Sequence, residues 1–115
     1  MSKPIDQKIR KTINKVKQEH ILQYGKYHCM ARGHNVDGQR IDPSHIIGVG
    51  RCNAIGKPEL AYDPNNIQME CRAAHREWED YSPAVRYHKN LDVKVAYLKE
   101  HDLERYNILM DKLEQ

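Results

Sequence analysis

Three side chains in this sequence, His45, Asn66 and His75, are of the types that can cut a phosphodiester with the help of a divalent cation. Such hydrolysis needs a group that takes a proton from water, a cation that stabilises negative charge on the phosphate, and ligands that hold the cation. An unprotonated histidine is a suitable base. Amide oxygens and imidazole nitrogens are suitable ligands, so this set indicates metal-dependent cleavage of a nucleic-acid backbone.

The first of these histidines is expected at the end of a strand. Residues 27–50 contain two short runs around a turn rich in Gly, Asn and Asp, which predicts two strands, with His45 ending the second. Gly48, Gly50 and Gly56, followed by a proline, then predict an irregular loop of about 15 residues, long enough to suggest a functional role.

The other two side chains are expected on a helix over residues 66–79, with an Asp or Asn as its N-cap. Asn66 and His75 are nine positions apart, which is two and a half turns. Within one helix they would therefore lie on different faces. If Asn66 lies at or before the first turn, however, its backbone is not yet helical and its side chain can turn toward the metal.

Helices are also expected at both ends of the chain. Isoleucines and a valine recur at helical spacing over residues 5–23, which predicts an amphipathic helix ended by Gly25. Residues 1–26 carry seven Lys or Arg against two acids, so this helix either attracts phosphate or is simply a solvated surface. Ser82 is expected to cap a short helix, and Asp92 and Asp102 to cap two more that support the rest of the domain.

The run Asp42-Pro-Ser-His-Ile-Ile and the run Asn66-Ile-Gln-Met-Glu-Cys-Arg-Ala-Ala-His-Arg-Glu resemble the HNH endonuclease signature. Among such proteins the chain looks most similar to small phage and prophage nucleases, including the NinG (Rap) recombination group. The resemblance implies a ββα-metal core, a β-hairpin crossed by one helix around the cation. It also implies that His45 activates water, that Asn66 binds the metal or orients its ligands, and that His75 binds the metal.

The sequence departs from the HNH pattern directly before the proposed base, where most relatives have Asp or His and this chain has Ser44. The nearest acid is Asp42. Positions 42 and 44 of a strand point to the same face, so Asp42 is either the missing metal ligand or the cap of a turn before proline. Glu70 and Glu77 are further candidate carboxylates, although such side chains are more often solvated.

A second departure concerns cysteines. Many relatives hold a structural zinc with two Cys-x-x-Cys pairs, but here Arg32 and Ala74 stand at the second positions after Cys29 and Cys71. A structural zinc is therefore not expected. We expect these two cysteines to lie near each other as small buried residues. Three cysteines at wide spacing, without an export signal, also argue against disulfides.

Composition sets the remaining limits. A chain of 115 residues with 39% hydrophobic and 30% charged residues is typical of one soluble domain. No apolar run approaches the ~20 residues of a membrane span, and no signal peptide is visible, so we expect a cytoplasmic protein with no membrane partner. The prediction is one α+β domain: a basic helix (1–26), a ββα-metal core (27–80) and a helical tail (81–115).

The function expected from these observations is a DNA endonuclease, nonspecific or selective for DNA structure such as branches, in phage or prophage recombination or DNA processing. Its cofactor would be Mg, Mn, Zn or Ni. Candidate phosphate-binding residues are Lys8, Lys11, Lys15, Arg51, Lys57, Arg72 and Arg76. Two alternatives are a DNA-binding protein that has lost catalysis and a protein-interaction adaptor. A homodimer through the C-terminal helices also stays open.

Overall fold

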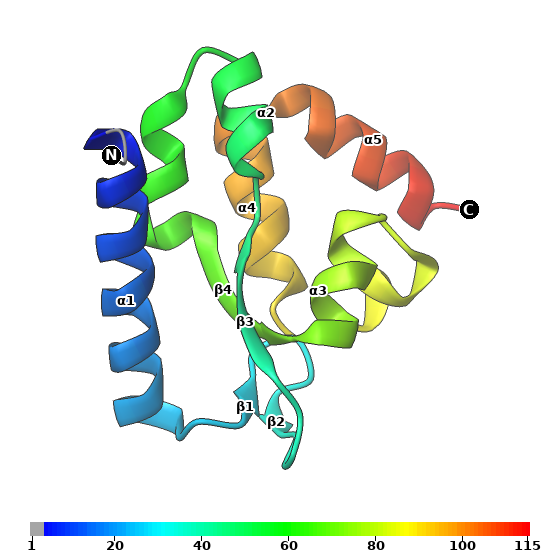
Figure 1. The fold of residues 1–115 in the computed structure, drawn as a ribbon. Coiled ribbons are helices and arrows are strands. Elements are labelled where there is room, and N and C mark those ends of the chain that lie inside the picture. The colour runs from blue at the N-terminus through cyan, green and yellow to red at the C-terminus, as the bar shows by residue number, and fades with distance from the viewer. Residues whose placement is uncertain (1–3) are drawn as a thin grey trace.

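The protein has an α+β fold, which confirms the class predicted from the sequence. The computed structural model describes residues 4–115, which contain five α-helices, three 3-10 helices and two small antiparallel sheets (Figure 1). None of the helices in this part of the chain is both long enough and apolar enough to cross a membrane.

A two-stranded antiparallel sheet lies at the centre of the molecule (Figure 1). Strand β3 (Ile41–His45) pairs with β4 (Ile67–Cys71), so that His45 lies opposite Ile67. The expected helix over 66–79 is therefore wrong in its first half, and α3 covers only Arg72–Glu79. The reason is visible in the sequence: Ile67, Met69 and Cys71 alternate, which is the period of a strand, and all three are buried.

The segment 27–50 contains three strands, whereas the sequence predicted two. A short hairpin joins β1 (His28–Cys29) to β2 (His34–Asn35), and β3 follows. The prediction that His45 ends a strand is confirmed. Its strand, however, pairs with the distant β4 and not with the preceding hairpin.

The segment after His45 is mostly helical, so the predicted irregular loop is wrong. It forms α2 (Val49–Ala54) and the 3-10 helices η1 (Pro58–Tyr62) and η2 (Pro64–Asn66). Gly48 and Gly50 lie at the start of α2, where a low helix propensity costs little, and Gly56 follows its end with a φ of +71°. Cys52 is fully buried and its N–H donates to the Gly48 carbonyl, so packing holds this turn together.

The helices at the ends of the chain agree largely with the prediction. Helix α1 (Pro4–Tyr24) packs along η1 and β4 and ends at Gly25, whose φ is +92° (Figure 1). Asp102 caps α5 (Leu103–Leu113), and Ser82 caps η3 (Pro83–Tyr87). The cap predicted at Asp92 is wrong, because α4 (Leu91–His101) begins after Asn90.

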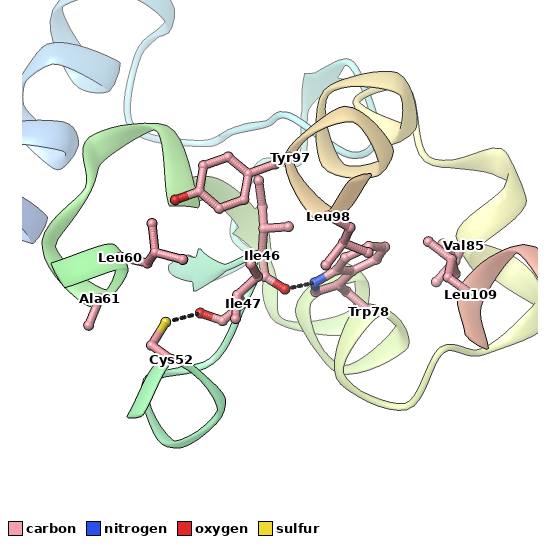
Figure 2. Packing of buried hydrophobic residues seen from close by; sticks show 10 residues of the cluster. All are labelled: Ile46, Ile47, Cys52, Leu60, Ala61, Trp78, Val85, Tyr97, Leu98 and Leu109. Carbon is pink, nitrogen blue, oxygen red and sulfur yellow. Dashed lines mark hydrogen bonds between the residues drawn. The ribbon is translucent and has the colours of Figure 1, made fainter. Parts of the chain in front are cut away.

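One hydrophobic core joins the C-terminal helices to the strand that carries His45. It contains Ile46 and Ile47 just after β3, Trp78 from α3, and leucines from α4 and α5 (Figure 2). The Trp78 indole N–H donates to the Ile46 carbonyl over 3.0 Å. Helices α3, α4 and α5 therefore fix the end of β3, and with it the imidazole of His45.

Candidate active site

A cleft of about 400 Å³ lies where the end of β3 and the start of α2 meet α3 and α5. Its polar and charged lining comprises His45, Arg51, His75, Glu79, Tyr81 and Arg105. The cleft thus brings together the two predicted histidines, which are thirty positions apart in the sequence.

His45 is held in one protonation state by its neighbours. Its Nε2 lies 3.0 Å from the carbonyl oxygen of Ala61. A carbonyl can only accept, so Nε2 carries the hydrogen and Nδ1 keeps its lone pair. Burial lowers the pKa of His45, the Ala61 hydrogen bond opposes this, and nearby His75 lowers it further. His45 is therefore neutral at pH 7, as a general base must be.

His75 lies between two carboxylates. Its Nδ1 is 3.4 Å from Asp42 Oδ2, and its Nε2 is 3.5 Å from Oε1 of Glu79, one helical turn further along α3. If Nδ1–H points to Asp42, Nε2 offers its lone pair on the side where Glu79 lies. Histidines that bind metals are commonly oriented by a carboxylate in this way.

Asp42 contacts the His75 imidazole but does not line the cleft. It is 6% exposed, and it forms ion pairs with Arg40 at 2.8 Å and Arg72 at 3.5 Å. Asp42 and Ser44 are both buried, so they share a face as predicted. The sequence left Asp42 either a metal ligand or the cap of a turn, and in the structure its carboxylate lies beside His75 and pairs with two arginines.

Asn66 is a buried clamp on the segment between the two strands. Its side chain accepts a hydrogen bond from the Ile47 N–H at 2.7 Å and donates to the carbonyls of Ile47 and Leu60, each at 2.9 Å. The residue is 0% exposed and does not line the cleft. Its amide thus positions the backbone next to His45 and Ala61, where the sequence had suggested a metal ligand.

Two of the predicted phosphate-binding residues have partners within the protein. Arg51 forms two hydrogen bonds with Asp102, at 2.8 and 3.0 Å, which raise its pKa. Lys57 donates to the His101 carbonyl at 2.9 Å. Both side chains tie the region around α2 to the junction of α4 and α5, and only Arg51 also lines the cleft.

The other predicted phosphate-binding residues lie outside the cleft. Arg72 is half exposed and pairs with Asp42, and Arg76 is exposed on α3. The three lysines on α1 are exposed as well, with Lys8 placed over the Tyr62 ring: they are Lys8, Lys11 and Lys15. None of these five side chains lines the cleft.

Three polar or charged residues of the cleft were not predicted from the sequence as site residues: Glu79, Tyr81 and Arg105. The spacing of Glu79, four residues after His75, places both on one helix face and would have indicated it. Arg105 carries no comparable signal. Its place in the cleft depends on how α5 packs against α4 and η3.

The predicted contact between Cys29 and Cys71 is confirmed. Both are buried free thiols, and Cys29 Sγ accepts hydrogen bonds from the Cys71 N–H at 3.2 Å and the Arg32 N–H at 3.4 Å. Arg32 also pairs through two hydrogen bonds with Glu77, at 3.0 and 3.1 Å. Burial raises the pKa of Cys29, so this thiol is protonated at pH 7.

The two further candidate carboxylates are both paired within the protein, Glu70 fully buried and Glu77 partly exposed. Glu70 is fully buried and pairs with Lys94 at 2.6 Å, and Glu77 pairs with Arg32 and with His88. Neither lines the cleft. Across residues 4–115, no three His, Cys, Asp or Glu side chains converge as a ready-made metal site.

Comparison with protein-family models, curated proteins and solved structures finds no match for this chain.

Proposed function

We propose that this protein is a divalent-metal-dependent endonuclease that hydrolyses phosphodiester bonds in DNA. The observation that carries the proposal is the state of His45. One ring nitrogen is fixed by the Ala61 carbonyl, and the other has no hydrogen-bond partner among residues 4–115, in a cleft shared with His75. A neutral imidazole at the wall of a polar cleft can take a proton from water.

The order of elements around the cleft supports an HNH-type core. Two antiparallel strands, β3 and β4, are followed directly by helix α3. His45 ends the first strand and His75 lies on the helix, as the resemblance to HNH nucleases implies. Asn66, the third residue of the motif, has a structural role, because its amide holds the long connection between the two strands.

The donor set that fits a divalent cation is His75 Nε2 with the carboxylate of Glu79. One imidazole and one carboxylate suit a hard or borderline cation that completes its shell with water and phosphate oxygens. Such an ion, when bound, stabilises negative charge on the phosphate and on the leaving oxygen. The absence of a third converging ligand in residues 4–115 is compatible with a cation that is held partly by the substrate.

The chain's own residues then divide the work of hydrolysis. Nδ1 of His45 accepts a proton from the attacking water, and the hydrogen bond from Nε2 to Ala61 stabilises the resulting imidazolium. Asn66 keeps the adjoining backbone in place. Asp42 keeps His75 oriented. The proton leaves His45 to solvent, and the leaving oxygen is protonated by solvent, so the reaction consumes one water per bond cut.

A second candidate function is DNA binding without cleavage on the same scaffold. The observation that favours it is the state of Asp42, which already pairs with Arg40 and Arg72 and leaves the cleft one carboxylate short of the usual pattern.

The test is cleavage of supercoiled and branched DNA by the purified protein with Mg, Mn, Ni, Zn or a chelator. We expect metal-dependent nicking that His45→Ala reduces by about a thousandfold, within the range for loss of a general base. His34→Ala is the matched control, because His34 is exposed on β2 away from the cleft. DNA binding without cutting in every metal would favour the second candidate, and undiminished cutting by the folded His45→Ala protein would remove His45 as the base.

A further inference from the structure

We propose that Tyr81 and Arg105 form a second phosphate subsite in the cleft, which makes the site selective for a polynucleotide strand over an isolated phosphodiester. This inference rests on the proposed function and concerns the substrate that the cleft accepts. Both residues line the cleft with the two histidines, but they come from the end of α3 and from α5.

The backbone at Tyr81 indicates that its side chain is needed there. Tyr81 follows the end of α3 with a φ of +48°, and no other non-glycine residue between positions 4 and 115 has a positive φ. The Ser82 N–H donates to the Glu77 carbonyl at 2.9 Å, and the Tyr81 N–H donates to the Trp78 carbonyl at 3.1 Å. This is the helix ending in which glycine is common, because a bulky residue is strained.

The Tyr81 ring is fixed, while its hydroxyl remains available. The ring packs against the hydrophobic core and tilts at 57° against the Trp78 indole, with 5.1 Å between ring centres. Within the described residues the hydroxyl has no hydrogen-bond partner, although Arg105, Asp102 and Arg51 are near enough to influence it. A phenol hydroxyl carries its proton at neutral pH, so it can donate to an anionic oxygen.

Arg105 supplies the charge that the neighbouring arginine lacks. Arg51 is neutralised by its paired hydrogen bonds with Asp102. The exposed guanidinium of Arg105 forms no ion pair within 4.0 Å in the part of the chain that the structure describes. An unpaired guanidinium next to a free hydroxyl donor is suited to the two oxygens of a phosphate.

The position of Tyr81 and Arg105 in the cleft indicates a substrate with more than one phosphate. Tyr81 and Arg105 come from just after the end of α3 and from α5, whereas His45 and His75 come from the end of β3 and from within α3, so the cleft contains two polar groups on different elements. A strand that places one phosphate at the histidines can offer its neighbouring phosphate to Tyr81 and Arg105. A small diester that carries only one phosphate uses the first group alone.

The experiment compares two substrates across matched variants. The substrates are a single-stranded oligonucleotide and bis(4-nitrophenyl) phosphate, which has one phosphate only. The variants are Tyr81→Phe, which removes only the free hydroxyl, Arg105→Gln, and Lys99→Gln. Lys99 is exposed on α4 outside the cleft and provides the same loss of charge as a control.

We expect Arg105→Gln to raise KM for the oligonucleotide about tenfold, the effect of losing one charged hydrogen bond, and Tyr81→Phe to raise it severalfold. KM for bis(4-nitrophenyl) phosphate, and kcat for both substrates, should match the wild type. For Arg105→Gln the salt dependence of oligonucleotide binding should decrease by about 0.7 in log-log slope, one phosphate contact on a single strand. Equal losses on both substrates, or no loss on the oligonucleotide, would overturn the subsite.

Failure of the nuclease proposal can be told apart from failure of the subsite. If no metal supports cleavage, the same variants are compared by fluorescence anisotropy of the labelled oligonucleotide. A Kd about tenfold weaker for Arg105→Gln, with Lys99→Gln unchanged, supports the phosphate subsite without catalysis. A Kd that Arg105→Gln and Tyr81→Phe leave unchanged overturns it, whether or not the protein cuts DNA.

Discussion

The ammonium of Lys94 donates a hydrogen bond to Nδ1 of His88 across 2.7 Å inside the protein. The other ring nitrogen of His88 lies 2.8 Å from Glu77, and Lys94 also pairs with buried Glu70. Because Lys94 donates to Nδ1 and the Glu77 carboxylate accepts from Nε2, His88 must be the neutral tautomer. Burial lowers the pKa of His88, the Glu77 hydrogen bond opposes this, and the charge of Lys94 lowers it further.

The protein should therefore lose stability as the pH falls below about 6.5, the usual pKa of an unfolded histidine. His88 has a lower pKa in the folded than in the unfolded state, so the unfolded chain binds the proton first. This contribution is complete above pH 6.5 and disappears as the pH falls through the folded pKa. Urea unfolding between pH 7.5 and 5 measures it, and His88→Gln should flatten the slope.

His20 and His45 also have pKa values lowered mainly by burial, so part of the slope should remain in that variant. His34→Gln, at an exposed position, is the control and should leave the slope as in the wild type. Identical slopes for His88→Gln and the wild type would contradict the assignment of a neutral, buried His88.

Because Cys29, Cys71 and Ala74 pack together, a zinc site can be engineered at this position. These residues form a small buried cluster, and Arg32 reaches it through its backbone N–H. Adding two cysteines with Arg32→Cys and Ala74→Cys should create a four-thiolate site for zinc. Titration with Co²⁺ should give the visible absorption of a tetrahedral thiolate complex in the double variant.

Each single variant serves as a control for this site, because three thiolates bind more weakly than four. Removal of the metal should destabilise the double variant more than the wild type, since Arg32 no longer pairs with Glu77. Absence of the cobalt spectrum in a folded double variant would show that these four positions do not converge on one point.

How far the sequence determines the fold can be judged from individual elements. Helix α1 was predictable because its apolar residues recur at helical spacing over five turns, with a glycine to end it. Strand β4 was not recognised, because an Asp-Pro-Asn-Asn run before it reads equally well as a helix cap. The alternation of Ile67, Met69 and Cys71 favours a strand, and the pairing with β3, 22 to 30 residues earlier in the chain, decides for it.

In the candidate site, too, some residues could be predicted from the sequence and others are placed only by tertiary contacts. His45 and His75 could be singled out from the motif, since residue type and order were enough. The role of Asn66 depends on the carbonyls of Ile47 and Leu60, and no sequence pattern shows that these come within 3 Å of one amide. Arg105 joins the cleft through tertiary packing alone, which residue spacing does not encode.

The clamp formed by Asn66 predicts a shared loss of stability and activity. Asn66→Ala removes three buried hydrogen bonds and leaves the Ile47 N–H without its acceptor, while the Leu60 carbonyl keeps only the bond from the Asp63 N–H. We expect a loss of about 2 to 4 kcal/mol in the free energy of unfolding. Denaturant unfolding measures it, with the exposed Asn65→Ala as the control for a neighbouring amide.

The same variant should lose activity even at a temperature where it is folded, because the backbone that positions His45 and Ala61 becomes mobile. Full activity in folded Asn66→Ala protein would argue against a positioning role. Metal affinity should stay close to that of the wild type, whereas a direct ligand at this position would reduce it strongly.

The pairing of His75 with Glu79 predicts which carboxylate holds the cation. Glu79→Gln should weaken Mn²⁺ binding by about a hundredfold or more, because it removes a direct ligand, and Asp42→Asn by about ten to a hundredfold, as for a residue that only orients the histidine. Electron paramagnetic resonance of free Mn²⁺ measures both, independently of catalysis. Asp80→Asn, at an exposed carboxylate next in sequence to Glu79 and outside the cleft, is the control. A larger loss for Asp42→Asn than for Glu79→Gln would reverse the two roles and return Asp42 to the ligand position that the sequence first suggested.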